Sequence, residues 1–460
     1  MKFRKAMNIL FRAKAARLFL LFSAFVALMA SCSGNDYLNA IPSTATAIVK
    51  VDASKIDASK AASAFSSLLP VGNVEDCGLD FGSNVFVFET VDGNFGLCAK
   101  VKSAGKLADT FDALASEGKC GKVRKQGDFT FTDVNDAWAV GFSDKAMVVL
   151  GPVSAAALTE TQRSVARMLR QDEESSIVGR PMYAKLDSID GSVAMVAKVQ
   201  ALPEKLVAPF TVGAPSGTDA SQVLVAANFE LADGVLEMHG ETFSFDRQID
   251  AALKKANGVY RKIGGTYLDR VPASCKFGLF TNVDGKQFLP LLQANKPLQA
   301  LLAGLNTAID FDNIIRSVNG DMMLLSSGVM SDKLDMSMMA KVEAPSWTGD
   351  IGYWKQSCPA GSSITGGNGA WCYNSGDMKF AFGLVGDMFY GTTGSMPNLS
   401  VAGGDLRQMP SGILNKVRGR RLVMLLNISA ISADGTLPHG ILGFMKSALG
   451  NVSAVLYVQD

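Results

Sequence analysis

The chain has 460 residues, 48% of them hydrophobic, and a formal net charge of +1. A chain this apolar is not a disordered one, because it has enough hydrophobic surface to form a core. Its balanced charge also excludes the strongly basic surface with which proteins bind nucleic acids, so no nucleic-acid partner is expected.

The first 31 residues have the pattern of a secretory signal peptide. Six lysines and arginines and no acidic residue occupy the first 17 positions, and Leu18 to Ala30 form an apolar run without a charge. A basic region followed by a short apolar run and small residues is typical of such signals. The run is too short to span a bilayer, which takes about 20 residues.

The signal ends at a cysteine. Leu28-Met29-Ala30-Ser31-Cys32 resembles the lipobox of bacterial lipoproteins. The resemblance implies cleavage before Cys32, a thioether-linked diacylglycerol on its sulfur and a fatty acid such as palmitate on its amine. Stable anchoring takes two or more acyl chains. The alternative is a secreted protein in which the cysteine stands there by coincidence.

Residues 32–40 then form a short lipidated tether. Ser33 stands where some bacteria use aspartate to retain lipoproteins at the inner membrane. We therefore expect the outer membrane, with the periplasmic and the surface-facing leaflet both open. Removing the leader leaves 38 of the 44 basic residues against 43 acidic ones, so the net charge of the mature chain is about −5.

The mature chain is too long for one ordinary core and predicts two domains or more. Alternating β-branched and aromatic runs predict strands, and apolar residues behind Ser or Asp caps predict helices. In chain order, strands are expected over 46–51, 85–89, 96–101, 129–132, 137–142, 146–150, 193–199, 222–231 and 235–243. One helix is expected to end near residue 69, and three further helices are expected over 103–116, 154–170 and 246–262.

The same order of features returns in the second half of the chain. Four landmarks recur: Ile41-Pro42 as Val271-Pro272, Leu79-Asp80-Phe81 as Ile309-Asp310-Phe311, Ala99-Lys100-Val101 as Ala340-Lys341-Val342, and Ala139-Val140-Gly141-Phe142 as Ala381-Phe382-Gly383-Leu384. Ordered recurrence of this kind indicates an internal duplication. The alternative is a chance likeness between two stretches of common α and β patterning.

We therefore predict an α+β protein of two tandem, divergently duplicated domains, 41–265 and 266–460, with mainly antiparallel sheets covered by helices. The second copy is shorter, because it ends before the closing hairpin strand and helix of the first. One edge of its sheet is expected to be open, or to be filled by another element.

Several of these stretches carry a resemblance to a known family. They are the leader, Asp36 to Pro42, Gly78-Leu79-Asp80, Val85 to Phe88 and Gly96 to Val101. Together they resemble lipoproteins of Bacteroidota catalogued as domain-of-unknown-function 4836, most clearly over residues 28–150. The resemblance implies export and this architecture. It implies no activity, because the family has none assigned.

The sequence contains almost no histidine that could act in catalysis or bind a metal. The two histidines, His239 and His439, each precede a glycine. Ser-His-Asp and Cys-His sites need an oriented histidine, and zinc sites need several ligands. We therefore assign no catalytic, cofactor-binding or metal-binding residue.

Paired carboxylates can run hydrolysis without histidine, as in glycosidases. The candidate pairs are Asp310 with Asp312 and Asp133 with Asp136. Capping of turns and helices is the alternative role of these four residues.

Six cysteines besides Cys32 permit disulfides in an exported protein. None of them is spaced as Cys-x-x-Cys, so no redox motif or zinc knuckle is indicated. Cys358 and Cys372 flank a glycine-rich turn and are the candidate disulfide.

Three of the four tryptophans lie in one insertion-like segment, Trp347 to Tyr373. Trp347, Trp354 and Trp371 are candidates for stacking on sugar rings or on a partner surface. The alternative is that they pack a small core beneath the insertion.

These features predict a lipid-anchored cell-envelope protein that is not an enzyme and that binds or scaffolds an envelope protein or a glycan. The first alternative is a glycan-binding surface lipoprotein that uses the insertion. The second is a hydrolase with paired carboxylates. No cofactor is expected.

Overall fold

A computed structural model describes residues 35–52, 55, 76–202, 204–307, 309–328, 335–376, 378–393, 408–433 and 451–460. The signal peptide, Cys32, His439 and most of the helix predicted to end near residue 69 lie outside these residues. Within the described part of the chain, no helix is both long enough and apolar enough to cross a membrane.

The chain divides into two compact units. The first unit comprises residues 1–207, 224–230 and 437–451, and the second comprises 208–223, 231–436 and 452–460. The predicted boundary between residues 265 and 266 follows the sequence repeat and falls inside the second unit. The domain division by repeat stays a prediction.

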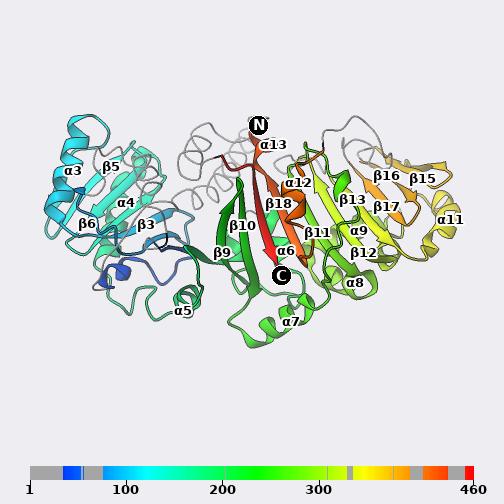
Figure 1. Cartoon of the computed structure of the whole chain (residues 1–460), viewed down its shortest axis with the longest axis horizontal. Coiled ribbons are helices and arrows are strands. Elements are labelled where there is room, and N and C mark those ends of the chain that lie inside the picture. The colour runs from blue at the N-terminus through cyan, green and yellow to red at the C-terminus, as the bar shows by residue number, and fades with distance from the viewer. Residues whose placement is uncertain are drawn as a thin grey trace. The chain divides into compact units, whose positions relative to one another are not determined.

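The first unit is built on an antiparallel sheet (Figure 1). Its strands are β1 (Ala47–Val51), β2 (Val85–Glu89), β3 (Phe95–Lys100), β4 (Arg124–Gln126), β5 (Phe129–Val134), β6 (Trp138–Phe142), β7 (Ala146–Gly151), β8 (Val193–Lys198) and β9 (Leu224–Ala232). They pair in the order β9–β8–β1–β2–β3–β7–β6–β5–β4. Every residue of β1 is buried, as its β-branched and apolar composition favours.

Helices pack on this sheet through apolar residues that recur every three or four positions. Ser103 caps α3, which buries Leu107, Phe111 and Leu114, and the Phe111 ring stacks on Phe142 of β6 with 5.9 Å between centroids. The described helices are η1 (Asp36–Ala40), α3 (Ala104–Ser116), η4 (Ala155–Ala157), α4 (Leu158–Leu169), α5 (Pro181–Asp187), η5 (Val199–Ala201) and α6 (Glu204–Thr211), which continues into the second unit.

The second unit has a mixed sheet. Its strands are β10 (Val235–Phe243), β11 (Phe277–Asp284), β12 (Val318–Ser326), β13 (Ser337–Val342), β14 (Ser363–Gly367), β15 (Ala370–Ser375), β16 (Met378–Val385), β17 (Met388–Thr392), β18 (Leu422–Asn427) and β19 (Ala454–Gln459). They pair in the order β10–β19–β18–β11–β12–β13–β17–β16–β15–β14, and β10 with β19 is the parallel pair.

The helices of the second unit are mostly short. They are α7 (Arg247–Asn257), η6 (Leu268–Arg270), α8 (Gly285–Ala294), α9 (Lys296–Asn306), α10 (Phe311–Arg316), η7 (Ser346–Asp350), α11 (Ile351–Gln356), α12 (Ser411–Asn415) and α13 (Ile428–Ala433). Asp246 caps α7, whose buried face is Ile249, Leu253 and Ala256. Helices and strands therefore alternate irregularly in both units, and the predicted α+β class is confirmed.

The two sheets share one strand order when β10 is set aside. Their paired residues correspond as well: Lys100 opposes Ala146 where Lys341 opposes Met388, and Ala139 opposes Leu150 where Ala381 opposes Thr392. The two landmarks that lie on strands thus occupy the same strand positions. The strand β10 lies parallel beside β19, as Figure 1 shows.

Candidate functional site

A buried carboxylate, Asp321, lies at an irregular part of β12. The pairing of β12 with β13 shifts register between Val318 and Met322, whereas the pairing with β11 stays regular and sets Asp321 opposite Asn282. A bulge of this kind redirects a side chain that the regular pleat points elsewhere. Asp321 is 7% exposed, although a central strand rarely buries a charge.

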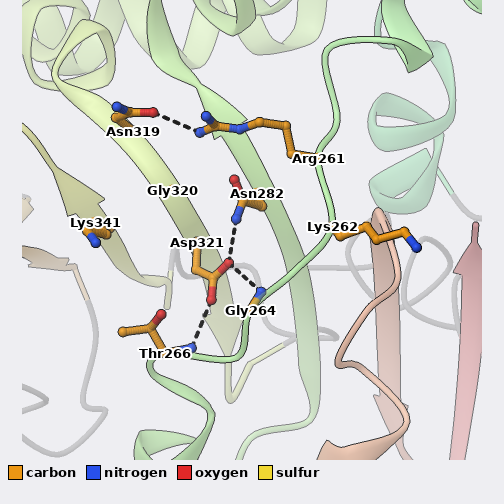
Figure 2. A pocket seen from close by; sticks show the side chains of 9 residues that line it. All are labelled: Arg261, Lys262, Gly264, Thr266, Asn282, Asn319, Gly320, Asp321 and Lys341. Carbon is orange, nitrogen blue, oxygen red and sulfur yellow. Dashed lines mark hydrogen bonds between the residues drawn. The ribbon is translucent and has the colours of Figure 1, made fainter.

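The Asp321 carboxylate is held by four donors, and Figure 2 draws those from Asn282, Gly264 and Thr266. Its Oδ1 accepts from Gly264 N–H at 2.9 Å and from Asn282 Nδ2 at 2.8 Å, and its Oδ2 accepts from Gly265 N–H at 2.6 Å and from Thr266 N–H at 2.8 Å. Three consecutive backbone N–H groups therefore converge on one carboxylate, an arrangement that proteins use to hold anions.

The loop that supplies these N–H groups is fixed from its other side by an arginine. Arg418 Nη1 donates to Gly264 O at 2.9 Å. Gly265 has φ +86°, and a β-carbon there would lie 2.3 Å from Arg418 Nη1. Glycine is therefore required at position 265, both for its backbone conformation and for the close approach of the guanidinium.

The hydrogen bonds decide the charge state of Asp321. Burial raises its pKa, but the N–H groups of Thr266, Gly264 and Gly265 stabilise the carboxylate and together hold the pKa below its usual value. Asp321 is therefore ionised at neutral pH. Because its lone pairs are already engaged, it shapes the site and is poorly suited to act as a general base.

A shallow cavity of about 360 Å³ opens over this carboxylate. It is lined by Arg261, Lys262, Gly264, Thr266, Asn282, Asn319, Gly320, Asp321 and Lys341. The lining residues include three cations and a single carboxylate, which is enclosed by its donors. The cavity therefore presents positive charge and neutral polar groups.

The cations of the cavity are held by neighbours on the surrounding strands. Arg261 Nη2 donates to Asn319 Oδ1 at 3.0 Å and also to Val283 O. Lys341 Nζ lies 3.7 Å from Asp387 Oδ2, with its side chain 48% exposed. In Figure 2 the Lys262 side chain runs away from the Asp321–Asn282 pair, so Arg261 and Lys341 are the cations most closely associated with the cavity.

One buried polar atom of a residue that lines the cavity has no hydrogen-bond partner. The Oδ1 of Asn282 is buried and accepts no hydrogen bond, while its Nδ2 donates to Asp321. In Figure 2 this oxygen points away from Asp321. A buried acceptor without a donor is unfavourable, so this oxygen is a local cost of the packing around Asp321.

The tryptophans predicted to stack on ligands mostly form a core. Trp347 is 0% exposed and Trp354 is 5% exposed. Their rings stack on each other with 6.2 Å between centroids and 5° between planes, and Trp371 meets Trp347 edge-on at 6.0 Å. Trp371 is half-buried, and the large exposed aromatic of the segment is Tyr353 at 70%. For Trp347 and Trp354, the prediction of exposed stacking surfaces is wrong, because both rings are buried and pack against each other.

The predicted disulfide is not formed. Cys358 and Cys372 are both free thiols, as are the other four cysteines among the described residues. The Sγ of Cys372 on β15 lies 3.5 Å from Asn374 Oδ1 and donates there instead.

The candidate carboxylate pair on α10 serves local structure. Asp310 accepts from Asn313 N–H at 2.9 Å as the cap of α10, and Asp312 accepts from Gln293 at 2.6 Å and from Asn306 at 2.9 Å. Neither residue lines the cavity, and both acids are committed to hydrogen bonds that fix helix ends.

The pair Asp133 and Asp136 lies in the first unit, at the turn between β5 and β6. Asp136 has φ +51° and is exposed. Burial, and then the negative charge of Asp136, raise the pKa of Asp133. Among the described residues, no group of three histidine, cysteine or acidic side chains is placed to hold a metal ion.

This cavity was not predicted from the sequence, although two short sequence patterns mark its position. Asn319-Gly320-Asp321 interrupts an otherwise apolar strand, and the loop before η6 carries the pair Gly264-Gly265. Each is an ordinary turn pattern by itself. Their meeting depends on pairing between β11 and β12, which local pattern does not reveal.

A protein-family model described as "Domain of unknown function (DUF4836)" matches residues 37–394. No curated protein matches the chain. Two solved structures of TP0453, crystal forms I and III, are similar with 8% and 9% identity; each covers 79% of this chain and, respectively, 93% and 94% of the TP0453 chain. Their TM-scores are 0.25 and 0.22, too low to carry an argument.

Proposed function

The chain belongs to the family described as Domain of unknown function (DUF4836), and from that premise we propose that it is a lipid-anchored protein of the cell envelope with a binding role and no enzymatic activity. The lipobox-like Leu28 to Cys32 supports the anchor, and Ser33 supports the outer membrane. Two acyl chains or more on Cys32 are sufficient for stable attachment.

We infer that the cavity over Asp321 binds a small anionic ligand. The observation that carries this is the saturation of Asp321: all four hydrogen bonds to its carboxylate come from the protein, while Arg261 and Lys341 remain on the cavity wall. An anionic group beside these cations gains charge-assisted hydrogen bonds. The class of ligand is therefore a phosphate or carboxylate.

Titration calorimetry with glucose 6-phosphate and with inorganic phosphate tests this site. We expect the sugar phosphate to bind and inorganic phosphate to bind more weakly, because inorganic phosphate spans less of the cavity. Arg261→Ala and Lys341→Gln should each weaken binding about ten-fold, the value of one charge-assisted hydrogen bond. Lys341→Gln keeps most of the side chain that covers Gly320.

The matched control is Lys379→Ala, which removes an exposed lysine from β16, outside the cavity. This variant should bind like the unaltered protein. The assignment fails if neither anion binds, or if Arg261→Ala and Lys341→Gln bind as tightly as Lys379→Ala.

The lipid anchor is tested by membrane fractionation. We expect Cys32→Ala, exported with the signal peptide of a secreted protein so that cleavage does not need Cys32, to leave the membrane fraction for the soluble fraction. Ser33→Ala behind the native leader keeps the thiol and should stay with the membranes. Membrane association of Cys32→Ala that survives a carbonate wash would contradict the anchor.

We also propose that the two units descend from one duplicated α+β element. The shared strand order and the corresponding pairs of β3 with β7 and β13 with β17 support this history. The edge beside β19 is covered by β10, which pairs with it in parallel. A covered edge lowers the risk of unwanted strand pairing.

A further inference from the structure

The start of the described chain is fixed firmly to the first unit. Tyr37, Leu38 and Ile41 are 4%, 2% and 0% exposed, so η1 is buried against the sheet. The Tyr37 hydroxyl donates to Asn84 O at 2.8 Å, and Cys98 Sγ donates to Tyr37 O at 3.3 Å. Lifting η1 from the sheet would expose three large apolar side chains, which is unfavourable in water.

Very little chain separates this fixed point from the proposed anchor. Three peptide steps join Cys32 to Asn35, and consecutive Cα atoms are about 3.8 Å apart, so the two residues lie within about 11 Å of each other. A lipidated Cys32 therefore brings the body of the first unit to the bilayer surface. A tether this short does not let the unit stand away from the membrane.

The point of attachment lies at one end of the strands. Asp36 Oδ2 is 3.0 Å from Lys145 Nζ, in the turn between β6 and β7. That turn adjoins the Lys100 end of β3, because Lys100 pairs with Ala146. The turn between β2 and β3, which contains Asp92, lies at the other end, where Phe95 pairs with Gly151. Five residue steps at about 3.3 Å place the two ends about 17 Å apart.

The surface at the attachment end is balanced in charge. Among the described residues, the ion pairs there include Asp36 with Lys145, Lys55 with Asp190, Lys106 with Asp76, and Lys100 with Asp80. Paired charges give little net attraction to an anionic bilayer. The contact with the membrane is therefore set by the tether and not by a basic patch.

We propose that this end of the first sheet, with the β6–β7 turn, lies against the phospholipid headgroups, and that the β2–β3 turn points away from the membrane. The inference rests on the proposed lipid anchor and adds to it an orientation of the first unit. Its partner is the bilayer surface itself.

Photocrosslinking in vesicles tests the orientation. The full lipidated protein is reconstituted in vesicles of phosphatidylethanolamine and phosphatidylglycerol that carry radiolabelled phospholipid. The photoreactive residue p-benzoylphenylalanine replaces either Asp144, exposed in the β6–β7 turn, or Asp92, exposed in the β2–β3 turn. We expect at least five-fold more labelled lipid at position 144, with a yield that 0.5 M salt leaves unchanged.

A longer tether provides the matched control. Twelve glycine and serine residues inserted between Gly34 and Asn35 should leave flotation with the vesicles intact and bring the yield at position 144 down to that at position 92. Equal yields at both positions in the unaltered tether, or a higher yield at position 92, would overturn the orientation. Failure of the lipidated protein to float with the vesicles would overturn the anchor itself, and the orientation with it.

Discussion

Replacing Trp347 with alanine should lower the free energy of unfolding of the second unit by about 3–5 kcal/mol, the cost of removing a large buried aromatic side chain. Trp347 is 0% exposed, and its ring contacts Trp354, Trp371, Phe382 and Phe389 at centroid distances of 5.9 to 6.5 Å. Urea unfolding followed by circular dichroism measures the change.

Tyr353 provides the matched control for this experiment. It lies on α11 in the same segment but is 70% exposed, so Tyr353→Ala should change the free energy of unfolding by about 0.5 kcal/mol or less. If Trp347→Ala costs no more than Tyr353→Ala, the aromatic cluster is not a core. The prediction that these rings are displayed for ligand stacking would then be restored.

Asp321→Ala should lower the free energy of unfolding of the second unit by about 3 kcal/mol at pH 7. The substitution leaves the Gly264, Gly265 and Thr266 N–H groups and the Asn282 amide without their acceptor, and unpaired buried donors are costly. It should also weaken anion binding, because the loop of Gly264, Gly265 and Thr266 at the cavity loses its hydrogen bonds to Asp321. Urea unfolding and calorimetry measure the two effects.

The effect of Asp321 should depend on pH in one direction. Its pKa in the folded protein is held below the usual value of an aspartate, so its contribution to stability is complete well above that usual value. The contribution is lost as the pH falls through the lower, folded pKa. The difference in stability between the unaltered protein and Asp321→Ala should therefore be constant from pH 6 to 8 and shrink below about pH 4.

Asp387→Ala is the control, because it removes a carboxylate that is 61% exposed and 3.7 Å from Lys341 Nζ. An exposed ion pair contributes at most about 1 kcal/mol, so this variant should unfold close to the unaltered protein. An Asp321→Ala protein as stable as Asp387→Ala at pH 7 would show that the four hydrogen bonds do not stabilise the site.

The strands were within reach of the sequence because they depend on local pattern. Runs such as Val85 to Phe88 are buried strand in the structure, as their β-branched and aromatic residues predict. The landmarks Ala99-Lys100-Val101 and Ala340-Lys341-Val342 mark corresponding strands, β3 and β13. Register along a strand follows the alternation of side chains, so matched motifs report matched positions.

The cavity over Asp321 could not be predicted from the sequence, because it is formed by contacts between residues that are far apart in the chain. Asp321 and Gly265 are 56 positions apart in sequence, and their contact needs β11 and β12 in register beside a register shift toward β13. The parallel pairing of β10 with β19 joins residues over 200 positions apart. For Trp347, the sequence indicated an aromatic cluster but not whether the ring is buried. A ring that stacks on a sugar and a ring that packs in a core can have the same local sequence.

Mass spectrometry of the N-terminal peptide of the protein isolated from membranes tests the central claim most directly. The account predicts that the mature chain begins at Cys32, and that this residue carries a diacylglyceryl group on sulfur and an acyl chain on its amine. A mature N-terminus at any other residue, or an unmodified Cys32, would contradict both the lipid anchor and the orientation that follows from it.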